Sequence, residues 1–104
     1  MNSQYLKFKR GDEVFFVKFT QSAGYEYAKV YKDVLFFYLH FKICVAEYFV
    51  LELAFKERIK KSQKDYFLKI SEVAVDTYIE EQQKKLFEKQ QLALLNEYSE
   101  KNKE

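Results

Sequence analysis

The residues of this chain best suited to chemistry are its one histidine and its one cysteine, His40 and Cys44. A Cys–His pair can produce a thiolate nucleophile only when the two side chains lie within hydrogen-bonding distance. Residues four apart share a face of a strand but are separated by about 13 Å, whereas they are neighbours on a helix. The elements that carry His40 and Cys44 therefore decide whether a dyad can form.

Other reactive patterns are weak. One histidine and one cysteine cannot build a His- or Cys-based metal site, and Gly11 and Gly24 are too far apart for a phosphate-binding loop. The adjacent carboxylates Glu80 and Glu81 fit a solvated helix face better than acid–base catalysis. The serines lack the context of a nucleophile elbow. The sequence predicts a protein that is not an enzyme and has no catalytic residue, no metal site and no cofactor.

Composition favours one small folded domain over residues 1–104, with 48% hydrophobic and 33% charged residues. Aromatic residues make up 19% of the chain, more than a small core needs, and the absence of proline predicts long regular elements. The net charge of +2 is too small to argue for nucleic acid by itself. The N-terminus lacks the apolar core of a signal peptide, which predicts a cytoplasmic protein.

The most apolar segment, DVLFFYLHFKICVAEYFVLELAF (33–55), has the length of a membrane span. Its charges Lys42, Glu47 and Glu52 each cost roughly 2.5–3.5 kcal/mol near a bilayer centre, so no membrane association is predicted. Apolar residues alternate up to Val45 and then recur at helical spacing. This change of period predicts a strand that ends near Val45 and a helix over 46–61, and one continuous helix is the alternative. The strand face expected in the core comprises Leu35, Phe37, Leu39, Phe41 and Ile43.

The N-terminal region reads as two hairpins. Gly11-Asp12 between alternating runs predicts a two-residue type II′ turn, and the break at 22–24 separates a further alternating run over 25–32. A second turn is expected at Lys32-Asp33. The first hairpin is expected to pair Arg10 with Glu13, Phe8 with Phe15, Leu6 with Val17 and Lys7 with Phe16. The second hairpin is expected to pair Ala28 with Phe37, Val30 with Leu35 and Glu26 with Leu39.

The C-terminal part predicts a helix over 71–98 that is capped by Ser71. About 27 helical residues span roughly 40 Å, longer than so small a domain needs. The distal end is therefore expected to pack on another chain. The candidate oligomer interface comprises Phe87, Leu94, Leu95 and Tyr98.

These elements define an α+β fold in which an N-terminal antiparallel β-meander of about four strands (4–45) precedes two helices (46–61 and 71–98). An N-terminal β-hairpin followed by an all-helical remainder is the alternative. The surplus of apolar helix surface favours a non-enzymatic protein-interaction module. We expect a homodimer or a small regulatory or inhibitory protein, of the kind bacteria and phages encode, that binds a protein partner.

A second hypothesis is single-stranded nucleic-acid binding through the outer sheet face, where bases would stack on aromatic rings and lysines would follow the phosphates. It ranks below protein binding, because a sheet buries aromatic residues just as readily. The candidate binding face comprises Tyr25, Tyr27, Lys29, Phe36, Tyr38, His40 and Lys42.

Overall fold

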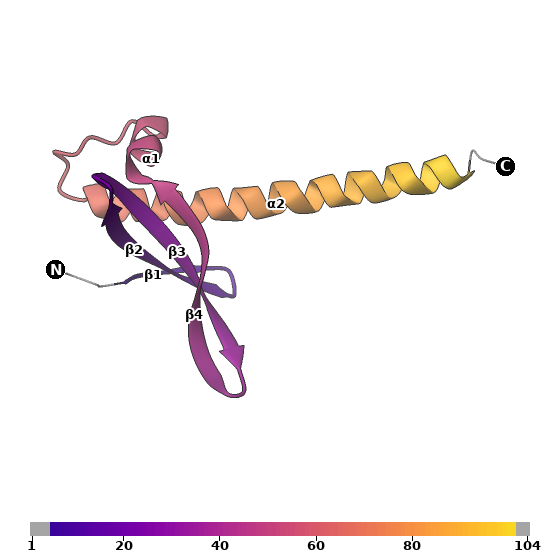
Figure 1. Cartoon of the computed structure of the whole chain (residues 1–104), viewed down its shortest axis with the longest axis horizontal. Coiled ribbons are helices and arrows are strands. Elements are labelled where there is room, and N and C mark those ends of the chain that lie inside the picture. The colour runs from indigo at the N-terminus through magenta and orange to yellow at the C-terminus, as the bar shows by residue number, and fades with distance from the viewer. Residues whose placement is uncertain (1–4, 102–104) are drawn as a thin grey trace.

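A four-stranded antiparallel sheet followed by a short and a long helix makes up the computed structural model, which describes residues 5–101 and their side chains up to residue 97 (Figure 1). The strand order β1-β2-β3-β4 is a simple meander. The predicted α+β class is therefore confirmed, although residue 4, where the first strand was placed, lies outside the described residues. The elements are β1 (Leu6–Arg10), β2 (Glu13–Ser22), β3 (Tyr25–Phe36), β4 (Leu39–Phe49), α1 (Val50–Lys56) and α2 (Tyr66–Lys101).

The β1–β2 hairpin has the predicted register. Arg10 pairs with Glu13, and the pairs Phe8–Phe15, Leu6–Val17 and Lys7–Phe16 follow along the ladder. Gly11 has a φ of 63°, as the first central position of a type II′ turn requires. The turn chemistry and the apolar face specify the same register, which is why local sequence sufficed here.

The second hairpin differs from the prediction. β3 continues through Lys32-Asp33 without a turn and ends at Phe36, and the chain reverses at Phe37-Tyr38. Lys32 pairs with Ile43 and Asp33 with Lys42, so the alternation of β3 continues through the expected turn. The three predicted pairs of this hairpin are wrong. Ala28 pairs with Tyr48, Val30 with Ala46, Leu35 with His40 and Phe36 with Leu39.

A β-bulge explains why the alternation seemed to stop at Val45. Val30 pairs with Ala46 whereas the next residue, Tyr31, pairs with Cys44, so Val45 has no partner of its own in β3. An extra residue inverts the phase of the strand beyond it. The sequence prediction took this inversion for the start of a helix, but β4 continues to Phe49.

The helices have other bounds than predicted. α1 begins at Val50 rather than residue 46 and ends at Lys56, close to Arg58, whose left-handed φ of 54° cannot continue a helix. α2 begins at Tyr66, because the carbonyl of Asp65 accepts the first helical bond from the Lys69 N–H at 2.9 Å. Ser71 is not a cap: it is buried inside α2 and donates its hydroxyl to the Phe67 carbonyl at 2.8 Å. No helix within residues 5–101 is long and apolar enough to cross a membrane.

The core lies between one face of the sheet, called the inner face below, and the two helices. Phe15, Val17 and Val30 are fully buried on the sheet side. α2 contributes its first turns and α1 one side. The buried cluster comprises Phe8, Phe15, Val17, Ala28, Val30, Val50, Leu53, Ala54, Tyr66, Ile70, Ala74 and Val75.

This core predicts the effect of truncating its largest buried ring. Phe15→Ala should lower the free energy of unfolding by about 3–5 kcal/mol, since it removes a fully buried phenyl group and leaves a cavity. Phe55→Ala is the matched control, because Phe55 is 88% exposed on α1; its effect should stay within about 0.5 kcal/mol. Urea denaturation followed by circular dichroism measures both. Equal losses for the two variants would contradict the placement of the core.

Candidate functional site

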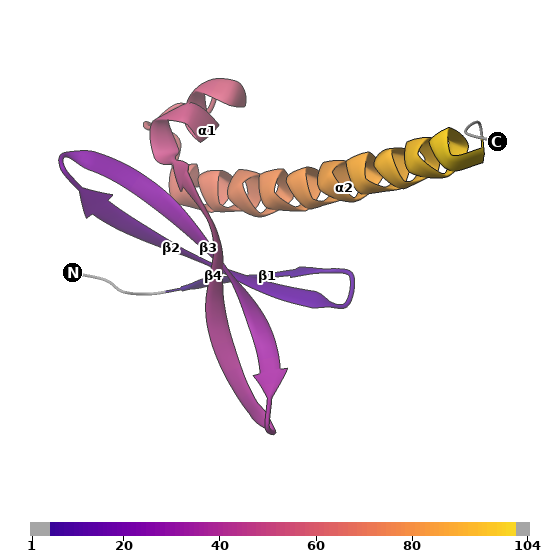
Figure 2. The same cartoon turned by 45° about the vertical axis from the view of Figure 1, so that its right-hand side comes forward.

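The β3–β4 hairpin projects beyond the rest of the sheet. The β2–β3 ladder reaches no further than the pair Phe15–Lys32, so residues 33–42 pair only within the hairpin. We call residues 33–42 the arm. Figures 1 and 2 show it extending away from both helices.

The arm exposes apolar side chains that were expected to be core. Leu35 and Leu39 are about 60% exposed and the tip residue Phe37 is 78% exposed. The expectation that this strand face is buried is therefore wrong. No helix follows the hairpin this far out, which leaves Leu39 and Phe41 uncovered (Figure 2). Leu35 instead pairs with His40 on the opposite face of the sheet, on which neither helix packs, and Phe37 lies in the turn. The exposed members of the expected core face are Leu35, Phe37, Leu39, Phe41 and Ile43.

The inner face of the arm continues the face on which the core is built. Val34 pairs with Phe41 and Phe36 with Leu39 on that face, in phase with the buried Ala28 and Val30. Side chains on one strand alternate between faces, so these residues would be buried if the helix layer continued over them. The inner face of the arm therefore continues the core side of the sheet, but no helix packs on it.

The tip of the arm is an unusual turn. Phe37 and Tyr38 have φ values of 51° and 65°, and Tyr38 is 96% exposed. Positive φ at both central positions is the requirement of a type I′ turn, which Asn-Gly satisfies best. Bulky residues held there cost on the order of 1–3 kcal/mol each. Backbone strain of this kind is concentrated at functional sites in proteins.

The distal half of α2 also exposes apolar side chains. The helix is packed on the sheet around Ile70, Ala74 and Val75, but Leu86 is 58% exposed. Leu86 follows Ile79 by seven residues, so it continues the stripe that faces the sheet nearer the start of the helix. The predicted interface residues Phe87, Leu94 and Leu95 are exposed as well, and the side chain of Tyr98 lies outside the described residues.

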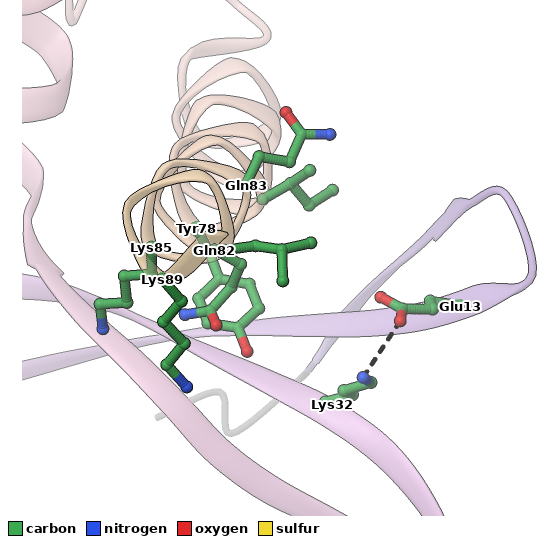
Figure 3. A pocket seen from close by; sticks show the side chains of 9 residues that line it. Glu13, Lys32, Tyr78, Gln82, Gln83, Lys85 and Lys89 are labelled. Atoms are coloured by element: carbon green, nitrogen blue, oxygen red, sulfur yellow. Dashed lines mark hydrogen bonds and ion pairs between the residues drawn. The ribbon is translucent and has the colours of Figure 1, made fainter. Parts of the chain in front are cut away.

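An open cavity of about 520 Å³ marks where α2 leaves the sheet (Figure 3). Across it from the helix, Lys32 donates to the carboxylate of Glu13 at 3.1 Å. Nearby, the Tyr48 hydroxyl donates to Glu81 at 3.0 Å, and burial followed by this hydrogen bond raises the pKa of Tyr48. The cavity lining is Glu13, Lys32, Tyr78, Ile79, Gln82, Gln83, Lys85, Leu86 and Lys89.

The predicted nucleic-acid face is assembled only in part. By the β3–β4 register, Phe36 lies on the inner face and Tyr38 lies in the turn. The other five residues share the opposite face, called the outer face below. They are Tyr25, Tyr27, Lys29, His40 and Lys42.

Sequence reasoning missed the aromatic centre of that outer face. Tyr5 contacts Phe16 and Tyr31, with ring centroids 6.2 and 5.2 Å apart. The confirmed β1–β2 register already placed Phe16 on this face. Tyr31 was overlooked because the expected turn lay beside it.

His40 and Cys44 do not form a dyad. They stand four residues apart on β4, as the strand prediction required. His40 Nδ1 lies 3.0 Å from an Asp33 carboxylate oxygen, and the Cys44 thiol donates to the Ala46 carbonyl at 3.6 Å. Within the described residues no group of three metal-ligating side chains occurs either.

Comparison with protein-family models, curated proteins and solved structures finds no match for this chain. Its functional assignment rests on the geometry of the arm, of α2 and of the outer face.

The tip predicts an unusual response to substitution. Phe37→Asn/Tyr38→Gly, called the arm variant below, places the preferred type I′ residues in the turn. At low protein concentration, where dissociated chains are compared, its free energy of unfolding should equal or exceed that of the wild type, because backbone strain is relieved. Thermal and urea unfolding measure this. A loss above about 2 kcal/mol would show that the aromatic pair supports the fold itself.

Proposed function

We propose that the chain is a non-enzymatic protein-interaction module that associates with a second copy of itself. The inner face of the arm of one copy packs against the distal half of α2 of the other. One observation carries the proposal: the core face of the sheet continues without a helix, while the core-facing stripe of α2 continues without a sheet. Each copy thus has the surface that the other lacks.

The amount of exposed apolar surface supports an assembly. Monomeric proteins rarely expose contiguous apolar patches larger than a few hundred Å². Here Phe36, Leu39 and Phe41 are each about half exposed or more on one face of the arm, and Phe36 is extended by the ring of Phe37, 4.3 Å away. The same face of the sheet is closed nearer α2 by the fully buried Phe15, Val17 and Val30.

The dimensions of the chain support the same conclusion. Its radius of gyration is 18.1 Å, whereas a compact domain of this length has about 13 Å. The excess comes from the arm and α2, which project from the core in different directions (Figures 1 and 2). Packing two copies through these projections would bury both.

A two-fold dimer follows from the number of contact surfaces on each chain. Each copy has one arm and one distal helix, so a reciprocal contact uses both pairs and leaves none open. A heterologous chain of contacts would instead leave an arm exposed at one end. Closure therefore favours the dimer over a filament.

Light scattering after size exclusion at tens of micromolar tests the association. The wild type should have twice the 12.6 kDa chain mass. The arm variant should dissociate at about tenfold higher concentration or more, because it removes both exposed aromatic rings at the tip of the arm. Phe55→Gln is the control: it removes an equally exposed phenyl group on α1 and should leave the mass unchanged. A monomeric wild type, or equal loss in the control, would refute the proposal.

Mixing two defective variants tests the reciprocal contact. Leu86→Gln, the helix variant, should also weaken the dimer, because Leu86 is exposed on distal α2 and continues the core-facing stripe. A mixture of arm and helix variants retains one intact arm and one intact helix, so it should form more dimer than either variant alone. A dimer built from the two distal helices alone would show no effect of the arm variant and no such recovery.

A further inference from the structure

The outer face of the sheet concentrates positive charge. Five lysines lie on it against two carboxylates, which gives a net charge of +3, although the whole chain has only +2. The rest of the sequence therefore has a net charge of −1. One of the carboxylates, Asp33, already contacts His40. The charged residues of this face are Lys7, Lys9, Lys18, Lys29, Lys42, Asp33 and Glu47.

Aromatic rings lie among these lysines. The Lys42 ammonium group is 4.7 Å from the Phe16 ring centroid and 5.2 Å from that of Tyr5, and the Lys18 ammonium group is 5.6 Å from Tyr5. Such an exposed cation–π contact is worth about 0.5–1 kcal/mol. A base stacked on an aromatic ring is worth about 1–3 kcal/mol. A base can therefore displace a lysine from the ring while the ammonium group takes the adjoining phosphate.

A second aromatic group extends the platform along β3. Tyr27 and Phe49 have ring centroids 4.9 Å apart, and Tyr25 lies 6.0 Å from Phe49 and is 54% exposed. Tyr27 and Tyr31 are four residues apart on one strand, a separation of about 13 Å. Lys29 lies between them in the same strand and on the same face. Ring and ammonium groups thus alternate along a line.

We propose that the outer face binds single-stranded nucleic acid, with bases on the Tyr5–Phe16–Tyr31 cluster and phosphates at Lys18 and Lys42. Alternating rings and lysines fit unpaired bases joined by phosphates, whereas a duplex presents only its backbone to such a face. Both helices pack on the inner face, so this surface stays accessible. It is also opposite the inner face of the arm, so the inference does not rest on self-association.

Fluorescence anisotropy with a labelled twenty-nucleotide oligothymidylate tests the inference on the full chain. The wild type should bind with an affinity that falls as salt rises. Tyr31→Leu keeps an apolar side chain in the strand and should weaken binding roughly five- to a hundredfold, the loss of one stacked base. Phe55→Leu, which makes a similar change on α1, should bind like the wild type.

A second pair of variants separates the contribution of charge to oligonucleotide binding from that of stacking. Lys42→Gln should weaken binding and reduce the salt dependence by about one phosphate contact, while Lys60→Gln in the α1–α2 connection should not. The arm variant should keep full affinity, so failure of the dimer proposal would not remove this result. Lack of binding at tens of micromolar would overturn the inference. Equal affinity of Tyr31→Leu and the wild type would also overturn it, as would equal affinity of the wild type for a twenty-base-pair duplex, because either result would show that charge alone drives binding.

Discussion

The packing of the first turns of α2 on the inner face of the sheet is the contact on which the rest of this molecule depends. Ile70, Ala74 and Val75 are fully buried against a sheet whose buried residues include Phe15 and Val17. This contact fixes which side of the meander is covered and how far. A helix of 36 residues spans about 54 Å, yet only its beginning lies on the core. The sheet likewise continues past the core as the arm. The distal part of α2 and the arm both project because the helix and the sheet, each long, are in contact over only a short length.

The functional proposals follow from what this contact leaves uncovered. On the inner face the uncovered surface is apolar and ends in a strained aromatic turn at Phe37 and Tyr38, which suits a dry contact with another chain. On the outer face the uncovered surface mixes rings with lysines around Tyr5 and Lys42, which suits a ligand with bases and phosphates. A sheet with one packed face can therefore provide two surfaces of different chemistry without an enclosed site.

The fold was predictable where sequence signals were local. Gly11-Asp12 set the first hairpin and its register, and a run of helix-forming residues without glycine or proline predicted most of α2. The second hairpin was predicted wrongly for two reasons. A bulge at Val45 inverts the alternation of the strand, and Phe37 and Tyr38, which form the turn, are not residues that favour turns. The exposure of the arm was not predictable either, since it depends on where a distant helix leaves the sheet. The candidate nucleic-acid face was found only in part for the same reason: one misplaced turn moved Phe36 to the wrong side and concealed Tyr31.

The central claim, that a second copy covers the arm, is tested most directly by isotope-filtered nuclear Overhauser spectroscopy. A mixture of uniformly carbon-13-labelled and unlabelled chains reports only contacts between copies. The reciprocal dimer predicts cross-peaks from Phe36, Leu39 and Phe41 of one copy to Leu86 of the other. Cross-peaks confined to the distal helices would show that the arm stays uncovered, and their complete absence at tens of micromolar would show that the chain does not associate with itself. Either result would contradict the account.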